Sequence, residues 1–130
     1  RISAQSTAFV NEAYTALKSD LKRAHYLLKL RDVGFNADTE TSSDVEFLMQ
    51  QLELHERVDE VGKAADPIAA LEVLAQELKQ QQAQLIEQFS IQYTEENLTE
   101  AKNTALKLQF YERLTSQLRK KQEHYEEELL

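Results

Sequence analysis

The stretch DVEFLMQQLELHERVDE, Asp44 to Glu60, predicts a helix with two different faces. At the rotation of an α-helix, Phe47, Leu54 and Val58 fall within about 60° of one another, and Val61 continues their row. A row of this kind is typical of the side of a helix that packs into a core. Other helices of the chain must therefore supply the apolar side chains against which this row packs.

The opposite side of the same helix should be polar and is only partly so. It gathers one methionine and three glutamates, with two leucines at its edge: Met49, Glu53, Glu56, Glu60, Leu48 and Leu52. Apolar side chains framed by carboxylates indicate a surface that binds a partner. The alternative is that the two leucines pack under a neighbouring helix or a second domain, because helices with wide apolar sides are common in bundles.

Composition predicts an all-α protein. The 130 residues include only two glycines and one proline, and the chain is long enough for one domain, or for one domain with a fragment of another. A net charge of -8 argues against binding to nucleic acid or an anionic membrane and favours a basic partner. The absence of cysteine excludes disulfides and thiolate metal sites and suits a reducing compartment. No run of about 18 apolar residues is present to form a transmembrane helix.

Periodicity and turn signals divide the chain into three parts. Residues 1–31 contain two amphipathic segments, the first from Ser3 to Lys18 and the second capped by Ser19 or Asp20. Residues 32–43 lose the helical period and collect glycine, asparagine, aspartate, serine and threonine, which predicts a linker. Residues 44–130 predict an antiparallel three-helix bundle. Because the chain opens on Arg1 in a helical pattern, we expect it to be a piece whose N-terminal part is missing.

Within the bundle, Gly62 is expected to end the first helix, and Asp66 before Pro67 predicts the start of the second. The second helix should run to about Ser90 and the third from about Glu95 nearly to the chain end. On the third helix Phe110 points away from the core residue Ala101 and has no obvious buried place. Since the first and third helices of such a bundle are neighbours, one surface can hold both Phe110 and the exposed leucines.

The histidines, carboxylates and glycines of the sequence do not form a recognisable catalytic, cofactor or metal site. A di-iron bundle requires Glu-x-x-His pairs, but the residues three places before the histidines are Lys22, Leu52 and Lys121. Two glycines cannot build a phosphate-binding loop. We therefore expect no enzyme, with each histidine a partly exposed structural residue.

Three segments carry a resemblance to a known family. FVNEAYTALKSDLKRAHYLL, Phe9 to Leu28, resembles the third and fourth helices of a J-domain. The continuation LLKL, together with FLMQQLELHERVDE from Phe47 and LKLQFYERL from Leu106, is similar to the HscB branch of co-chaperones for iron-sulfur cluster assembly. The segments occur in the order expected for that branch and cover nearly the whole chain.

This resemblance implies a function. J-domains of this branch stimulate ATP hydrolysis by a specialised HscA-like chaperone through a His-Pro-Asp loop, which these 130 residues lack, since their one proline is Pro67. The C-terminal bundle of the family binds the IscU-like scaffold protein on which iron-sulfur clusters are assembled. Its scaffold-binding positions map onto seven residues here: Leu48, Met49, Leu52, Glu53, Glu56, Glu60 and Phe110.

Taken together, the sequence predicts a co-chaperone adaptor that delivers the scaffold to the chaperone, located in the bacterial cytoplasm, or in the mitochondrial matrix if the source is eukaryotic. This fragment should not stimulate the ATPase itself. The alternative is a structural or self-associating helical bundle in which the two-faced helix forms the interface between copies. A metal or cofactor enzyme is a remote third option.

Overall fold

A computed structural model describes residues 19–35 and 44–129 of the chain. Every regular element in those two ranges is helical: α2 (Asp20–Leu30), α3 (Val45–Glu60), the short 3₁₀ helix η1 (Val61–Lys63), α4 (Pro67–Thr94) and α5 (Leu98–Glu128). The predicted all-α fold is confirmed. The predicted helix from Ser3 to Lys18 lies outside the described residues.

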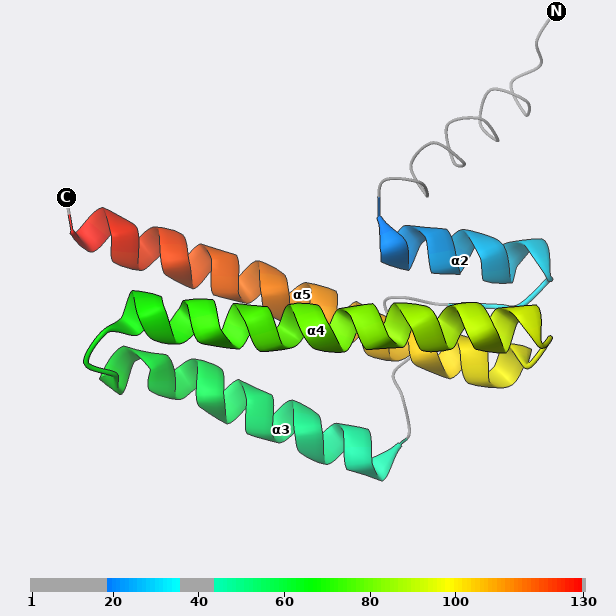
Figure 1. The fold of residues 1–130 in the computed structure, drawn as a ribbon, viewed down its shortest axis with the longest axis horizontal. Coiled ribbons are helices and arrows are strands. Elements are labelled where there is room, and N and C mark those ends of the chain that lie inside the picture. Colours follow the sequence, from blue (N-terminus) through cyan, green and yellow to red (C-terminus); the bar gives the residue numbers. More distant parts are fainter. Residues whose placement is uncertain (1–18, 36–43, 130) are drawn as a thin grey trace, which may run out of the picture.

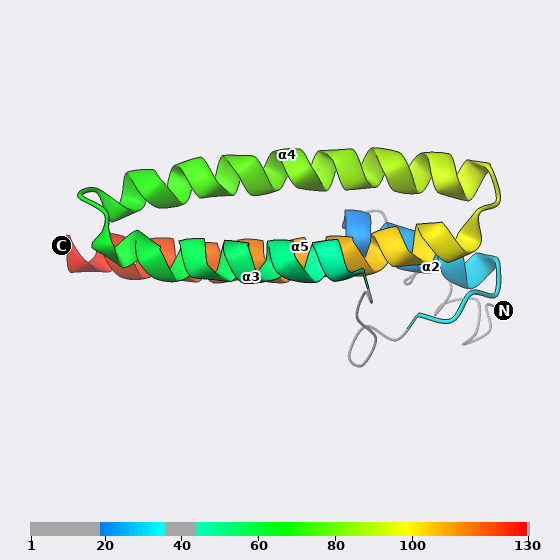
Figure 2. The same ribbon diagram turned by 90° about the horizontal axis from the view of Figure 1, so that it is seen from below.

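The three long helices form an elongated bundle, and α2 lies along one end of it (Figure 1). Helices α3 and α4 run antiparallel, as do α4 and α5, so that α3 and α5 run in the same direction. The view from below places α4 to one side of the other two helices (Figure 2). This is the three-helix arrangement that the sequence predicted.

Side-chain caps fix where three of the helices begin. Asp44 accepts hydrogen bonds from the backbone N–H groups of Glu46 and Phe47 at 3.0 and 3.4 Å, and Asp66 accepts one from Ala69 at 3.1 Å, directly before Pro67. Ser19 accepts the N–H of Lys22 at 3.3 Å. These bonds satisfy donors that the first turn of a helix leaves without partners. The predicted start of α4 at Asp66 is therefore confirmed, and of the two predicted caps of α2 it is Ser19 that caps the helix.

Three predicted boundaries, the end of α3, the end of α4 and the start of α5, differ from the structure by a few residues. Gly62 does not end α3 as a left-handed residue, because the chain passes from Glu60 into η1 and no described glycine has a positive φ. Helix α4 continues to Thr94, beyond Ser90, and α5 begins only at Leu98.

The turns that follow α2 and α4 share one geometry with a non-glycine residue in the left-handed region. Asp32 has φ 59° and Glu96 has φ 63°. After each, a backbone N–H reaches back to a carbonyl five residues earlier, Val33 to Leu28 at 2.9 Å and Asn97 to Gln92 at 2.8 Å. These bonds close the helix ends in the Schellman arrangement, in which glycine usually takes the left-handed position.

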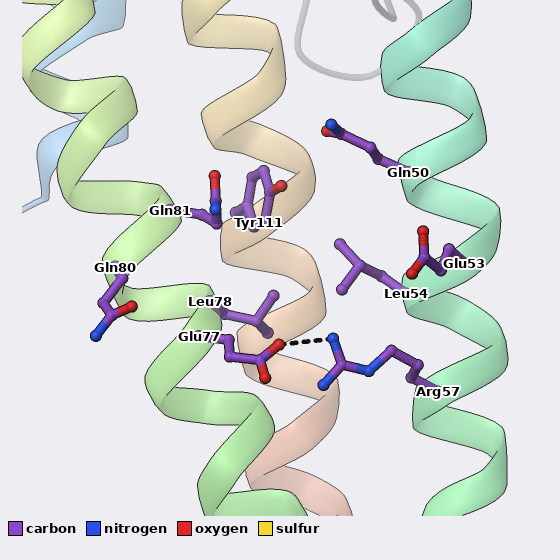
Figure 3. A pocket seen from close by; sticks show the side chains of 9 residues that line it. All are labelled: Gln50, Glu53, Leu54, Arg57, Glu77, Leu78, Gln80, Gln81 and Tyr111. Atoms are coloured by element: carbon purple, nitrogen blue, oxygen red, sulfur yellow. Dashed lines mark hydrogen bonds and ion pairs between the residues drawn. The ribbon is translucent and has the colours of Figure 1, made fainter.

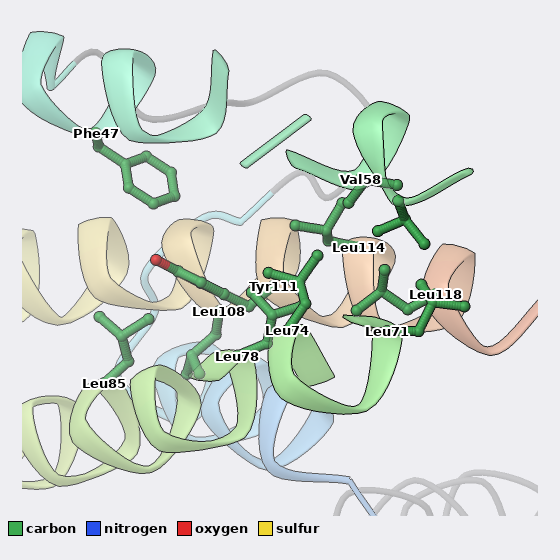
Figure 4. Packing of buried hydrophobic residues seen from close by; sticks show 11 residues of the cluster. Phe47, Val58, Leu71, Leu74, Leu78, Leu85, Leu108, Tyr111, Leu114 and Leu118 are labelled. Atoms are coloured by element: carbon green, nitrogen blue, oxygen red, sulfur yellow. The ribbon is translucent and has the colours of Figure 1, made fainter. Parts of the chain in front are cut away.

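The main core lies between α3, α4 and α5 (Figure 4). Its buried side chains come from all three helices and from η1: Phe47, Val58, Val61, Leu71, Leu74, Leu78, Leu85, Leu108, Tyr111, Leu114 and Leu118. The predicted core row of α3 is confirmed, with Leu54 only partly buried. This packing turns the other side of α3 toward solvent.

A second, smaller cluster attaches α2 to the bundle. Its buried members are Ala24, Leu28, Phe89, Ala101 and Ala105. Val33 and Phe35 pack against it, so the first residues of the predicted linker are in contact with the bundle rather than free. The Tyr93 hydroxyl also donates a hydrogen bond to the Leu27 carbonyl at 3.1 Å, which ties the end of α4 to α2.

Candidate protein-binding surface

The outer side of α3 exposes large apolar side chains. Leu48 is 42% exposed, and Met49 and Leu52 are each 66% exposed. Glu53, Glu56 and Glu60 are also exposed along the same helix. We call these six residues together with Phe110 the acidic-apolar face. Its three apolar members on α3 could have been sealed under a neighbouring element, and in the described part of the chain they are not.

Phe110 lies where α5 meets α3. It is half-buried and packs against the main core, so the expectation that it has no place in the core was only partly right. Its ring stands edge-on to that of Phe47, with centroids 5.5 Å apart and planes at 88°. On the solvent side its ring is 5.6 Å from that of His55, with planes at 79°. Phe110 thus contacts α3 through Phe47, which precedes Leu48, and through His55, which follows Leu52 by three residues.

Several contacts fix α3 in its orientation. At its start, Lys107 Nζ of α5 lies 3.1 Å from Oδ2 of Asp44 and 5.6 Å from the centre of the Phe47 ring. Toward its end, Lys121 Nζ of α5 donates a hydrogen bond to the Val58 carbonyl at 3.2 Å. Both ends of α3 are therefore held by α5, the helix that carries Phe110.

A groove of about 300 Å³ separates α3 from α4 on the other flank of α3 (Figure 3). Arg57 crosses it to Glu77 of α4 at 2.6 Å, an ion pair that lowers the pKa of the Glu77 carboxyl and raises that of the Arg57 guanidinium. Tyr111 lies at its base, and burial raises the pKa of its hydroxyl. Glu53 borders both this groove and the acidic-apolar face.

The histidines are distributed over separate elements. His25 lies against the Phe35 ring at 4.5 Å between centroids, His55 lies against Phe110, and His124 Nε2 is 3.0 Å from Oε1 of Glu128. Within the described ranges no three acidic or histidine side chains are arranged to hold a metal ion. None of the described helices combines the length and the apolar character needed to cross a membrane.

Two exposed residues extend the acidic-apolar face and were missed in the sequence. Val45, 69% exposed, lies three residues before Leu48, and His55 lies three residues after Leu52. Residues three or four apart occupy the same side of a helix. The same spacing rule, applied to the sequence, would have assigned both residues to the acidic-apolar face. Val45 precedes the core row by two residues, and the imidazole of His55 was interpreted as structural.

A helical bundle that holds one helix at both ends and presents leucine, methionine and glutamate from it to solvent has the features of a protein-binding module. Comparisons with known proteins give the family. Residues 43–119 match the model of the HSCB C-terminal oligomerisation domain. The chain belongs to the HscB family of co-chaperones, which confirms the resemblance seen in the sequence.

Three similar proteins illustrate the match. The chain is 35% identical over 117 residues to the co-chaperone protein HscB homolog of Aeromonas salmonicida, covering 90% of this chain and 68% of that one. It is 36% identical over 120 residues to the homolog from Shewanella baltica strain OS185, covering 90% and 69%. The solved chaperone HscB from Vibrio cholerae superimposes with a TM-score of 0.77 at 33% identity, over 97% of this chain and 71% of that structure.

Proposed function

We propose that this bundle binds the scaffold protein of iron-sulfur cluster assembly and delivers it to an HscA-like ATP-dependent chaperone. The observation that carries the proposal is the exposure of Leu48, Met49 and Leu52 beside three carboxylates on a helix anchored at both ends. The co-chaperone relatives support it at the level of the family. We place this activity in the bacterial cytoplasm, since the similar co-chaperones come from bacteria.

The two kinds of side chain on the acidic-apolar face have different roles in this proposal. Leu48, Met49, Leu52 and Phe110 lose water against an apolar spot on the scaffold, each contributing about 1 to 2 kcal/mol. The carboxylates of Glu53, Glu56 and Glu60 meet basic groups there, which speeds encounter and fixes orientation more than it adds affinity. Raising the salt concentration should therefore slow association while leaving dissociation nearly unchanged.

A calorimetric titration of the scaffold protein into this chain tests the proposal. The double variant Leu52→Ala with Phe110→Ala should lose measurable binding and keep its helical circular dichroism. A matched control is Val73→Ala, because Val73 is 60% exposed but lies on α4 outside the acidic-apolar face. Unchanged affinity of the double variant would remove this face from the function.

Stimulation of the chaperone's ATPase is a separate step. The sequence contains no His-Pro-Asp triplet, since its one proline, Pro67, is preceded by Asp66 instead of histidine and followed by Ile68 instead of aspartate. We therefore expect these residues to bind the scaffold without stimulating ATP hydrolysis. A longer chain that carries the J-domain loop of the family should do both, and a direct comparison of the two in an ATPase assay tests this expectation.

Self-association through the same face is the second candidate, favoured by the description of the matching family model as an oligomerisation domain. Sedimentation equilibrium separates the two candidates. A tight oligomer that dissociates when Met49 is changed to glutamate would support self-association, because Met49 is exposed in the single chain. A monomer that binds the scaffold would support the adaptor.

A further inference from the structure

Phe110 is the one member of the acidic-apolar face that comes from α5, and its ring is held between two rings of α3. The centroid of Phe47 lies 5.5 Å from it and that of His55 lies 5.6 Å from it. Phe47 and His55 are eight residues apart, which is about 12 Å along a helix. Phe110 therefore contacts two rings of α3 that start about two helical turns apart, in the seam of α3 and α5.

The two flanking rings differ in their surroundings. Phe47 is buried in the main core, 3% exposed, and its position is fixed by the packing of the bundle. His55 is exposed, and within the described part of the chain the contact with Phe110 is the only interaction that the structure gives its side chain. Removing the imidazole therefore leaves the core intact and opens one side of Phe110.

His55 also lies in line with the exposed leucines. It follows Leu48 by seven residues and Leu52 by three, the spacing of one helix face. His55 therefore lies on the same face of α3 as the exposed leucines and also contacts the Phe110 side chain of α5. An edge-on contact between aromatic rings contributes beyond simple burial and favours one relative orientation of the two rings.

We propose that His55 is a positioning residue that holds the Phe110 ring in the orientation in which it meets the partner. The inference rests on the proposed scaffold binding and adds a residue and a mechanism to it. A Phe110 ring already ordered in the free protein loses less side-chain freedom on binding than a mobile one. The imidazole acts through Phe110 and need not touch the partner itself.

The first measurement uses the free protein and needs no partner. In the wild type, the NMR resonances of the Phe110 ring should report a single ordered orientation close to the imidazole. In His55→Ala they should shift and average, while those of the Phe47 ring stay near their original positions. The melting temperature should change little, because His55 is exposed. Unaltered Phe110 resonances in His55→Ala would overturn the proposal.

The second measurement is scaffold affinity by calorimetry. His55→Ala should weaken binding by about threefold to tenfold, the range expected for one aromatic contact or one ordered side chain. His55→Phe restores a ring edge and should return affinity to within about twofold of wild type. His55→Gln keeps a polar side chain without an aromatic ring and should behave like His55→Ala. Equal binding by all three variants would contradict the proposal.

A double-mutant comparison separates positioning from direct contact. In a Phe110→Leu background there is no aromatic ring to hold, so adding His55→Ala should cost no further affinity. A full additional loss in that background would mean that His55 touches the partner itself, which overturns the positioning role. If the wild type fails to bind the scaffold at all, the proposed function fails with it, and the ring resonances still show whether His55 orders Phe110.

Discussion

Lys107 of α5 places its ammonium nitrogen 3.1 Å from Oδ2 of Asp44, the residue that caps α3. The same ammonium lies over the ring of Phe47 at 5.6 Å, and Phe47 in turn contacts Phe110. One cation therefore connects the start of the helix that carries the exposed leucines to the helix that carries Phe110. This connection helps to set the distance between the α3 residues of the acidic-apolar face and Phe110 of α5.

The Asp44 cap of α3 should therefore stabilise the protein more than a cap that makes no ion pair. Asp44→Ala removes both the backbone hydrogen bonds and the ion pair with Lys107, whereas Asp66→Ala removes only a cap, that of α4. We expect a fall in melting temperature of roughly 3–6 °C for a lost cap alone and a larger fall for Asp44→Ala. Thermal unfolding followed by circular dichroism measures both.

The variant Lys107→Met supplies the control for that comparison, since it keeps the Asp44 cap and an aliphatic side chain over Phe47. If the ion pair accounts for the difference, Lys107→Met should lower the melting temperature, and the double variant with Asp44→Ala should be little worse than Asp44→Ala alone. Equal falls for Asp44→Ala and Asp66→Ala would show that the pair adds nothing.

Stability should decrease in acid through two carboxyl groups. The hydrogen bond from Lys107 lowers the pKa of Asp44, and the one from Arg57 lowers the pKa of Glu77. A carboxyl whose pKa is lower in the folded state stabilises the fold above its unfolded pKa, and that contribution disappears as the pH falls through the folded value. We expect the melting temperature to drop between about pH 5 and pH 2, and less in a double variant with Asp44→Asn and Glu77→Gln.

Salt provides an independent check of the acid prediction. Both ion pairs are partly exposed, so added salt should screen them and reduce the difference between the wild type and the double variant at neutral pH. Parallel pH profiles for the two proteins would mean that other carboxyl groups control acid unfolding.

Features that depend only on residues close together in the chain could be predicted from the sequence. The Asp66-Pro67 start of α4 and the buried row of Phe47 and Val58 follow from spacing and cap chemistry. The sequence did not predict the turns at Asp32 and Glu96, because a left-handed residue is most often glycine and only occasionally asparagine or aspartate. The two turns also meet in the fold, where Arg31 Nη2 lies 2.8 Å from Oε1 of Glu96, 65 residues away, and local spacing contains no information on that contact.

The acidic-apolar face was only partly predictable for the same reason. Helical spacing alone places Met49 and the glutamates on the outer side of α3. The half-buried position of Phe110 depends on which helices are neighbours and how they are offset along their axes. A wheel drawn for one helix contains no information on that offset, so the contact between Phe110 and His55 could not be predicted from it.

Leucines of the two faces should differ sharply in their effect on stability. Leu71 is 1% exposed in the main core, and Leu71→Ala should lower the free energy of unfolding by about 2–5 kcal/mol because it leaves a cavity. Leu52 is 66% exposed, and Leu52→Ala should change it by less than about 0.5 kcal/mol. Urea unfolding measures both, and a large loss for Leu52→Ala would mean that its side chain packs within the protein or between copies.

The turn between α3 and α4 offers a test of packing at one atom. A Cβ added to Gly62 would lie 3.0 Å from the hydroxyl oxygen of Tyr125, and the φ of Gly62 is not in the left-handed region. Replacing glycine with alanine at a compatible backbone stabilises a protein by about 0.4–1 kcal/mol through the unfolded chain. Here the close contact should offset that gain, so Gly62→Ala alone should be nearly neutral. Tyr125→Phe removes the hydroxyl, and in that background Gly62→Ala should recover the full stabilisation in urea unfolding. Equal effects of Gly62→Ala in both backgrounds would show that the tyrosine moves aside without cost.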